Sequence, residues 1–322
     1  MIIHMSRKRL ISAALVAGMA AIAATEPVGP SGPVSGAVFD RKSRSVRPIL
    51  GVPGSSYLGS RIAGGLDEAA VSPDGRAVLT LAEGRLTLLR GLERLSPVTL
   101  GVEGTIPDAD RIVWSPDSSA AALYSSSSRR IQLVRDLDKT PAAGPVTELM
   151  AQGRVASLGV DASGNVVAGV EGAGVFLLTA GQTERLLGAF RNPVSLLMAR
   201  KGADLFVVDR EGASIVEIRD FLTAGSVMPF TEGLSAPAGV ALSKDARQMF
   251  VADAGDRKLK VFDVASRTKI SETELDFVPT GLDPLTSEAL SLIGSGGENQ
   301  PYYILDGGSN PAVYFVPAGR EE

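Results

Sequence analysis

The side chains that most often carry out catalysis are scarce in this chain. Its only histidine is His4, and it has no cysteine. Beyond residue 4, therefore, neither a Ser-His-Asp relay nor a thiolate nucleophile can form. A serine-lysine pair needs a lysine beside a strained serine turn, and none of the eight lysines, among them Lys244, Lys258 and Lys260, follows such a pattern. We expect the four serines at positions 125–128 to form a solvated hairpin loop.

Carboxylates are the remaining candidates for acid-base chemistry. A glycosidase needs two of them about 5 to 10 Å apart across a groove, a distance that a sequence does not reveal. Because charged residues are mostly exposed, we expect these carboxylates to form a solvated acidic surface. The candidates are Asp67, Glu68, Asp108, Asp110, Asp204, Asp209 and the acidic residues between 272 and 276.

Few residues of the chain are of the types that bind metals or cofactors. Zinc, haem and copper sites rely mostly on His, Cys and Met, whereas calcium needs only oxygen ligands. Asp253, Asp256 and Asp306 lie in predicted hairpin turns, where we expect them to cap the backbone. The Gly-Ser-Gly-Gly stretch at 294–297 does not open a helix and is therefore interpreted as a turn, not a phosphate loop. We assign no catalytic, cofactor-binding or metal-binding residue and expect no cofactor.

Composition bounds the class of protein. Apolar residues make up 44% of the 322 residues, which is ample for a hydrophobic core. Aromatic residues make up only 5%, with Trp114 the single tryptophan, and we expect it to pack between repeats. Acidic residues outnumber basic ones, 36 to 32. An acidic chain lacks the basic surface that phosphates need, so we expect no nucleic-acid partner.

The first residues are predicted to be a cleavable signal peptide, residues 1–23. Arg7, Lys8 and Arg9 supply a positive region, an apolar stretch follows, and Ala21 and Ala23 form a small-x-small cleavage pattern. A retained membrane anchor is the alternative, but it needs about 20 apolar residues and this stretch is shorter. We expect an exported protein, periplasmic or extracellular, that has no membrane span after cleavage. Residues 24–35, rich in Pro, Gly and Ser, are predicted to be a linker.

Residues 36–319 read as a repeat array. In FVADAGDRKLKVFD, residues 250–263, two apolar strands flank a tight polar turn. Six units open with a strand that leads into a turn, and anchors at Val71, Trp114, Val160, Met198 and Leu242 are 43, 46, 38 and 44 residues apart. A period of about 40 to 45 residues with four short strands is typical of a β-propeller blade. We therefore predict an all-β fold, a single β-propeller of four-stranded blades, with seven blades favoured over six.

The first hairpin sets the blade count. Residues 36–40 and 46–50 resemble residues 260–270, and we interpret them as the third and fourth strands of a blade. Residues 50–60, rich in Gly and Pro, are then a crossing segment. If strands of the last unit pair with this hairpin in one blade, the two ends of the chain close the ring together, which removes free sheet edges.

The repeats also resemble known families. FVADAGDRKLKVFD is similar to the repeat of NHL and YVTN-type β-propellers, and VSPDGR and WSPDSS resemble the strand and turn of TolB-type and WD40-like propellers. The resemblance covers about 280 residues and implies a bacterial propeller fold. Propellers include hydrolases, lactonases, receptors and scaffolds, so the fold leaves the chemistry open.

Because histidine and cysteine are missing beyond residue 4, we expect a role without catalysis. The first hypothesis is a monomeric, exported β-propeller that serves as a protein-interaction or scaffold module, with no catalysis. The alternatives are a propeller that binds a small ligand, and a calcium-dependent, lactonase-like hydrolase that uses the central channel. Exposed apolar surface would favour the first hypothesis, and a deep polar channel would favour the others.

Overall fold

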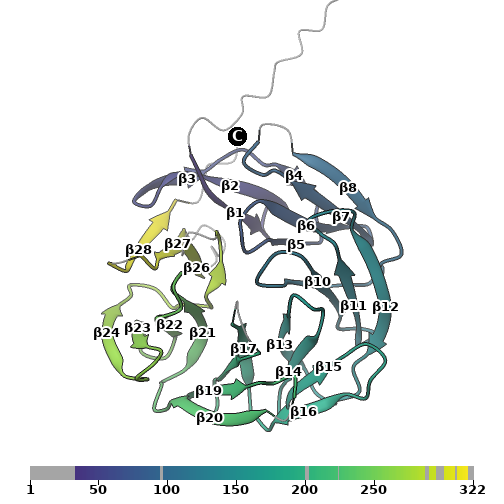
Figure 1. The fold of residues 1–322 in the computed structure, drawn as a ribbon. Coiled ribbons are helices and arrows are strands. Elements are labelled where there is room, and N and C mark those ends of the chain that lie inside the picture. The colour runs from purple at the N-terminus through teal and green to yellow at the C-terminus, as the bar shows by residue number, and fades with distance from the viewer. Residues whose placement is uncertain are drawn as a thin grey trace, which may run out of the picture.

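Seven small sheets form a ring. The computed structural model describes residues 33–94, 97–199, 203–223, 225–286, 290–294, 301–308 and 310–317, and these contain strands and turns but no helix. The 28 strands make seven antiparallel sheets of four strands each. Figure 1 shows the sheets arranged around a centre, like the blades of a propeller. The predicted all-β fold and the count of seven blades are confirmed.

Each sheet is built from one continuous stretch of chain. Blade 1 contains β1 (Val34–Asp40), β2 (Ser45–Val52), β3 (Ser55–Leu58) and β4 (Ala63–Gly64). Blade 2 contains β5 (Glu68–Val71), β6 (Ala77–Ala82), β7 (Arg85–Arg90) and β8 (Val98–Val102). Blade 3 contains β9 (Arg111–Trp114), β10 (Ala121–Ser125), β11 (Arg130–Arg135) and β12 (Ala142–Glu148). Blade 4 contains β13 (Val155–Val160), β14 (Val166–Val170), β15 (Gly174–Leu178) and β16 (Arg185–Gly188).

The remaining three blades follow the same order. Blade 5 contains β17 (Pro193–Met198), β18 (Leu205–Asp209), β19 (Ser214–Arg219) and β20 (Ser226–Thr231). Blade 6 contains β21 (Pro237–Leu242), β22 (Gln248–Asp253), β23 (Lys258–Asp263) and β24 (Lys269–Glu274). Blade 7 contains β25 (Asp283–Pro284), β26 (Leu290–Gly294), β27 (Tyr302–Asp306) and β28 (Ala312–Val316). In blades 2 to 7 the first strand lies nearest the centre and the fourth lies at the circumference (Figure 1).

Serine and aspartate side chains shape the turn between the first and second strands. In blade 2, Ser72 Oγ donates to Asp74 Oδ1 at 2.5 Å and accepts from the amide of Ala77 at 2.9 Å, and the amide of Gly75 donates to the Ser72 carbonyl. Ser115 makes the same pair of bonds in blade 3, and Ser243 in blade 6. The turn predicted from Ser-Pro-Asp-Gly is therefore confirmed, because the hydroxyl replaces the ladder bonds that the backbone loses there.

Blade 1 differs from the other six. Strands β3 and β4 pair with different halves of β2, while β1 occupies the opposite edge of β2. Across the sheet, then, β3 and β4 form one interrupted outer strand. The chain at 51–54 makes a tight hairpin turn, so interpreting residues 50–60 as a crossing segment was wrong.

The first hairpin also occupies another place in its blade than expected. Arg44 has a positive φ of 49°, and its carbonyl accepts a bond from the amide of the buried Leu66. The turns between the second and third strands of blades 3, 5 and 6 have the same arrangement: the amides of Leu149, Leu234 and Leu275 donate to the carbonyls of Arg129, Ala213 and Arg257, all with positive φ. By this criterion β1 and β2 are the second and third strands of their blade, not the third and fourth. No described residue fills the place of its first strand.

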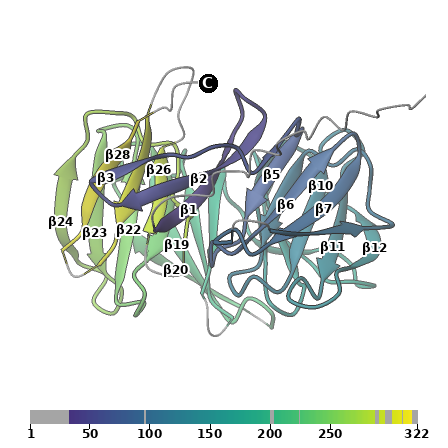
Figure 2. The ribbon, with the colours of Figure 1, turned by 90° about the horizontal axis from the view of Figure 1, so that it is seen from above.

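Side chains close the ring between blades 7 and 1. Val38, Ile49 and Leu58 of blade 1 pack against Leu285, Tyr302, Ile304 and Val316 of blade 7. Figure 2 shows β1 and β2 lying between β28 and β5. No described strand of blade 7 pairs with a described strand of blade 1. The described parts of these two blades therefore do not exchange strands, as the sequence had led us to consider.

The core lies between neighbouring blades. Each of the seven hydrophobic clusters joins two adjacent sheets, as when Trp114 packs with Leu79 and Leu88 of blade 2. Trp114 Nε1 also donates to the carbonyl of Ala70, 2.8 Å away, so the tryptophan does pack between repeats. In the described part of the chain, no helix is long and apolar enough to span a membrane.

Candidate functional site

Aspartates at the ends of second strands hold the backbone of the blades. Asp253 accepts hydrogen bonds from the amides of Ser235 and Ala236, at 2.9 and 2.7 Å, just before β21. Asp209 likewise accepts from the amides of Arg191 and Asn192 before β17. Asp306, at the end of the third strand of blade 7, accepts from the amide of Gly308. These carboxylates therefore satisfy backbone donors, as expected of turn caps.

Lys260 forms a buried ion pair that the sequence did not reveal. Its Nζ lies 2.6 Å from Asp253 Oδ2 and 2.8 Å from Asp256 Oδ2. Asp253 is fully buried and Lys260 is 8% exposed. Burial alone would raise the pKa of Asp253, but the bonds from Lys260, Ala236 and Ser235 outweigh it and lower the pKa. With both charges compensated, neither group is poised to transfer a proton.

The serine loop and two aspartates form a second polar cluster in blade 3. Ser125 is fully buried and donates to Asp108 Oδ2 at 2.7 Å, while Arg130 Nη2 lies 2.8 Å from Asp108 Oδ1. Ser126 binds Asp110. Ser125 is therefore not the solvated residue expected, because a carboxylate from the preceding loop satisfies it. Hydrogen bonds from Ser125 and Ser128 lower the pKa of Asp108 well below its usual range, and so weak a base does not activate a serine.

Several of the other candidate carboxylates form ion pairs with arginine or lysine, and Asp204 accepts a hydrogen bond from the amide of Asp220. Asp67 and Glu68 pair with Arg44 and Arg41. Glu272 bonds to Lys258 and Lys269, which lowers its pKa to about 2. Lys258 and Lys260, which the sequence left open as partners for a serine, thus bind carboxylates. Residues 295–297 of the Gly-Ser-Gly-Gly stretch lie outside the described residues.

The inner strands present few ionisable groups to the centre of the ring. Strands β5, β9, β13, β17, β21 and β25 contain only Glu68, Arg111 and Asp283. Arg111 lies over the ring of Tyr124, 6.0 Å from its centroid. Asp283 is exposed, yet the protein around it removes part of its hydration and raises its pKa. Among the described residues, no three His, Cys, Asp or Glu side chains are placed to hold a metal ion.

Apolar side chains are exposed on the circumference instead. The outer strand of every blade carries one large exposed apolar residue, from 46% exposed at Val146 to 63% at Phe315. We call this set the apolar rim: Tyr57, Val98, Val146, Leu186, Val227, Ile270 and Phe315. Neighbouring blades diverge toward the circumference (Figure 1), so the outermost side chains lose the contacts that bury their inner counterparts. The sequence pattern showed apolar strands but not which residues would lack a neighbour.

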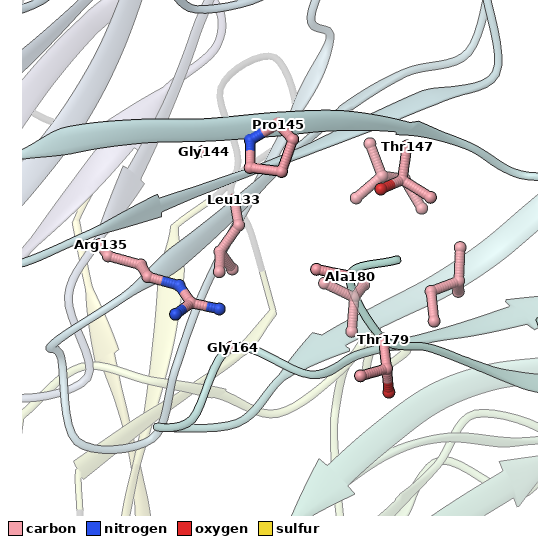
Figure 3. Close-up of a pocket in the computed structure, with 11 residues that line it drawn as sticks. Leu133, Arg135, Gly144, Pro145, Thr147, Gly164, Thr179 and Ala180 are labelled. Atoms are coloured by element: carbon pink, nitrogen blue, oxygen red, sulfur yellow. The ribbon is translucent and has the colours of Figure 1, made fainter. Parts of the chain in front are cut away.

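A cavity opens between the third and fourth strands of blade 3 and the second and third strands of blade 4. It has a volume of about 310 Å³. Its walls include the buried side chains of Ile131, Leu133, Val166 and Leu178. Figure 3 shows the guanidinium of Arg135 beside this apolar wall. The other lining residues are Gly144, Pro145, Thr147, Gly164, Thr179 and Ala180. We call this cavity the blade 3–4 groove.

Comparisons with known proteins support the fold. No protein-family model matches the chain, and neither does any curated protein. A functionally unknown protein from Desulfotomaculum acetoxidans is similar in structure, with a TM-score of 0.62, 14% identity and coverage of 88% of this chain and 99% of the other. A "putative 6-phosphogluconolactonase" from Bacteroides fragilis has a TM-score of 0.61 and 13% identity, covering 88% and 94%. The β-propeller domain of Cps50 (Swd1) from Myceliophteria thermophila has a TM-score of 0.58 and 12% identity, covering 82% and 89%.

The ring and these similarities define the class. The chain is a seven-bladed β-propeller. At identities of 12% to 14% the similarities show the fold alone, because one fold serves many chemistries.

Proposed function

We propose that this β-propeller is an exported protein-interaction module that binds a protein partner through the apolar rim. The observation that carries the proposal is the recurrence of one exposed large apolar side chain on the outer strand of all seven blades. Exposed apolar side chains gain free energy when a partner removes them from water, at about 25 cal/mol per Å². A repeated arrangement lets one partner contact several blades at once.

The polar clusters of blades 3 and 6 support a binding role. Asp108 is a weak base, and Asp253 and Lys260 compensate each other, so the described clusters stabilise the fold without an evident reaction. The inner strands contain only three ionisable residues, Glu68, Arg111 and Asp283. Secretion to the periplasm or the medium, suggested by residues 1–23, and a monomeric state are part of the proposal.

The proposal predicts that one segment of the rim dominates binding. Three rim residues on successive blades, Leu186, Val227 and Ile270, are replaced together by serine. The control replaces three exposed polar residues of two of these outer strands, β20 and β24, as Ser226→Ala, Ser271→Ala and Thr273→Ala. Residues 24–322 of each protein are used to capture partners from envelope and medium extracts, and the bound partner is identified by mass spectrometry.

We expect the rim variant to retain at least tenfold less partner than the control, with both proteins folded by circular dichroism. Equal retention by the two variants would refute binding through this rim segment. The lactonase-like alternative is tested on the same proteins. It predicts that calcium raises the melting temperature and that chelation lowers it, because a ligand that binds only the folded state stabilises it.

A further inference from the structure

In three of the blades, one residue fills the outer groove against the preceding blade. After the third strand of blades 2, 3 and 5, a turn places Leu92, Leu137 and Phe221 against the preceding blade, and each is only 2% exposed. Their amides donate to carbonyls just before the second strand of the same blade, those of Arg76, Ser119 and Ala203. We call these three residues groove plugs.

Blade 4 has alanine at this position. The turns of blades 2, 3, 4 and 5 share one backbone hydrogen bond. The carbonyl of the residue before the plug position accepts from the amide three residues further along the chain: Gly91 from Arg94, Asp136 from Lys139, Thr179 from Gln182 and Asp220 from Thr223. This register aligns Ala180 with the groove plugs. Ala180 is exposed, and it lines the blade 3–4 groove. The cavity therefore lies where a leucine or phenylalanine side chain fills the corresponding groove at blades 2, 3 and 5.

An arginine of the preceding blade binds the turn of two groove plugs. Arg90 Nε donates to the Leu137 carbonyl at 2.9 Å, and Arg90 Nη2 donates to the Lys139 carbonyl at 2.6 Å. Arg185 likewise donates to the carbonyls of Phe221 and Thr223. Arg135 ends the third strand of blade 3, as Arg90 does in blade 2.

Arg135 pairs with Ala142 in the sheet of blade 3, but it is exposed, and its side chain makes no hydrogen bond or ion pair with the described residues. It lies against Gly164, where a Cβ atom would come within 2.6 Å of Arg135 Nη2 and 2.5 Å of Leu133 Cδ2. Gly164 also has a positive φ of 85°, which favours glycine. The close approach of the Gly164 backbone thus keeps the guanidinium beside the apolar wall (Figure 3).

We propose that the blade 3–4 groove binds a small monocarboxylate with an apolar body. The carboxylate pairs with Arg135, whose planar guanidinium matches two carboxylate oxygens. The apolar body contacts Ile131, Leu133, Val166 and Leu178, in the place that a groove plug fills elsewhere. At about 310 Å³, the groove is at the small end of ligand cavities, which favours a medium-chain or single-ring acid over a lipid. The argument for this site does not rest on the proposed protein partner, although Val146 of the apolar rim lies between Pro145 and Thr147 of the groove.

Octanoate is a suitable probe, and 1-octanol is its neutral counterpart. Binding to residues 24–322 is measured by isothermal titration calorimetry. Arg135→Gln removes the cation, and Ala180→Leu restores a groove plug. Ala265→Leu is the matched control, because Ala265 is an exposed alanine in the corresponding turn of blade 6.

We expect octanoate to bind the unchanged protein at least tenfold more tightly than octanol does. Arg135→Gln should remove that preference, since a hydrogen bond to a charged group contributes about 1.5 to 3 kcal/mol, which is a factor of 10 or more. Ala180→Leu should abolish binding and raise the melting temperature, which also shows that this variant folds. Ala265→Leu should bind as the unchanged protein does. Failure of octanoate to bind, or equal binding by the folded Ala180→Leu protein, would overturn the proposal.

Discussion

Lys260 Nζ lies 2.6 Å from Asp253 Oδ2, and the two side chains form a buried ion pair at the end of blade 6. Asp253 also accepts two backbone amides, so the pair connects β22 and β23 with the segment that enters β21. Lys260 Nζ also lies 2.8 Å from Asp256 Oδ2.

Removing the cation alone should destabilise the protein strongly. Lys260→Met leaves Asp253 as a buried charge without its cation, which typically costs about 3 to 5 kcal/mol. The double variant Asp253→Asn, Lys260→Met removes both charges and should recover part of that loss. Urea denaturation measures the free energy of unfolding of each. A double variant less stable than Lys260→Met would contradict this account.

The same pair predicts acid sensitivity. The pKa of Asp253 is lower in the folded state than in the unfolded chain, so the unfolded chain takes up a proton first as the pH falls. The stability that Asp253 contributes is present above its unfolded pKa, about 4, and is lost as the pH falls through its folded pKa. The melting temperatures of the unchanged protein and of the double variant are compared from pH 7 to pH 2. The amount by which the unchanged protein melts higher should shrink below pH 4. A constant difference across that range would contradict this prediction.

Tyr302 predicts the opposite dependence in alkali. Burial, followed by the negative charge of Asp40, raises the pKa of Tyr302 to about 12, whereas the unfolded value is about 10. The unfolded chain therefore loses this proton first, and stability falls as the pH rises from 10 toward 12. Tyr302→Phe cannot ionise. Between pH 9 and pH 11.5 it should lose less stability than the unchanged protein; parallel losses would exclude this role for Tyr302.

Gln132 joins three segments of blade 3. Its Oε1 accepts from the amide of Ile106 at 2.8 Å, and its Nε2 donates to the carbonyls of Gly104 and Gly144 at 2.9 Å. Gln132→Leu keeps the volume but leaves these backbone groups without their partner, at a cost of about 1 to 3 kcal/mol. Gln152→Leu, at an exposed glutamine, is the control and should change the urea midpoint little. Similar midpoints for the two variants would show that the three bonds contribute nothing.

Local turn chemistry explains which parts of the fold were predictable. Ser72, Asp74 and Gly75 fix a turn by their own hydrogen bonds, so a repeat of such turns gives the blades and their number. The first hairpin was misplaced because an apolar strand pair has the same appearance anywhere in a blade. Its place depends on the bond between Leu66 and Arg44, 22 residues apart.

The candidate sites depend on contacts between blades, which are not visible in one strand. Asp253 was predicted to cap a turn, and it does, but its pairing with Lys260 needs the register of β22 and β23. Ala180 could have been compared with Leu137 and Phe221 only after the turns had been aligned by their hydrogen bonds. The exposure of the rim residues depends in turn on how far neighbouring blades diverge.

The contact between blades 7 and 1 has a consequence for chain connectivity. Because each sheet is complete within one stretch of sequence and side chains alone join the described parts of these blades, no described backbone ladder would break if that contact opened. A circularly permuted chain, with a linker from blade 7 to blade 1 and new ends between blades 4 and 5, would keep every described strand pair. We therefore expect the ring to form whichever blade stands first in the chain.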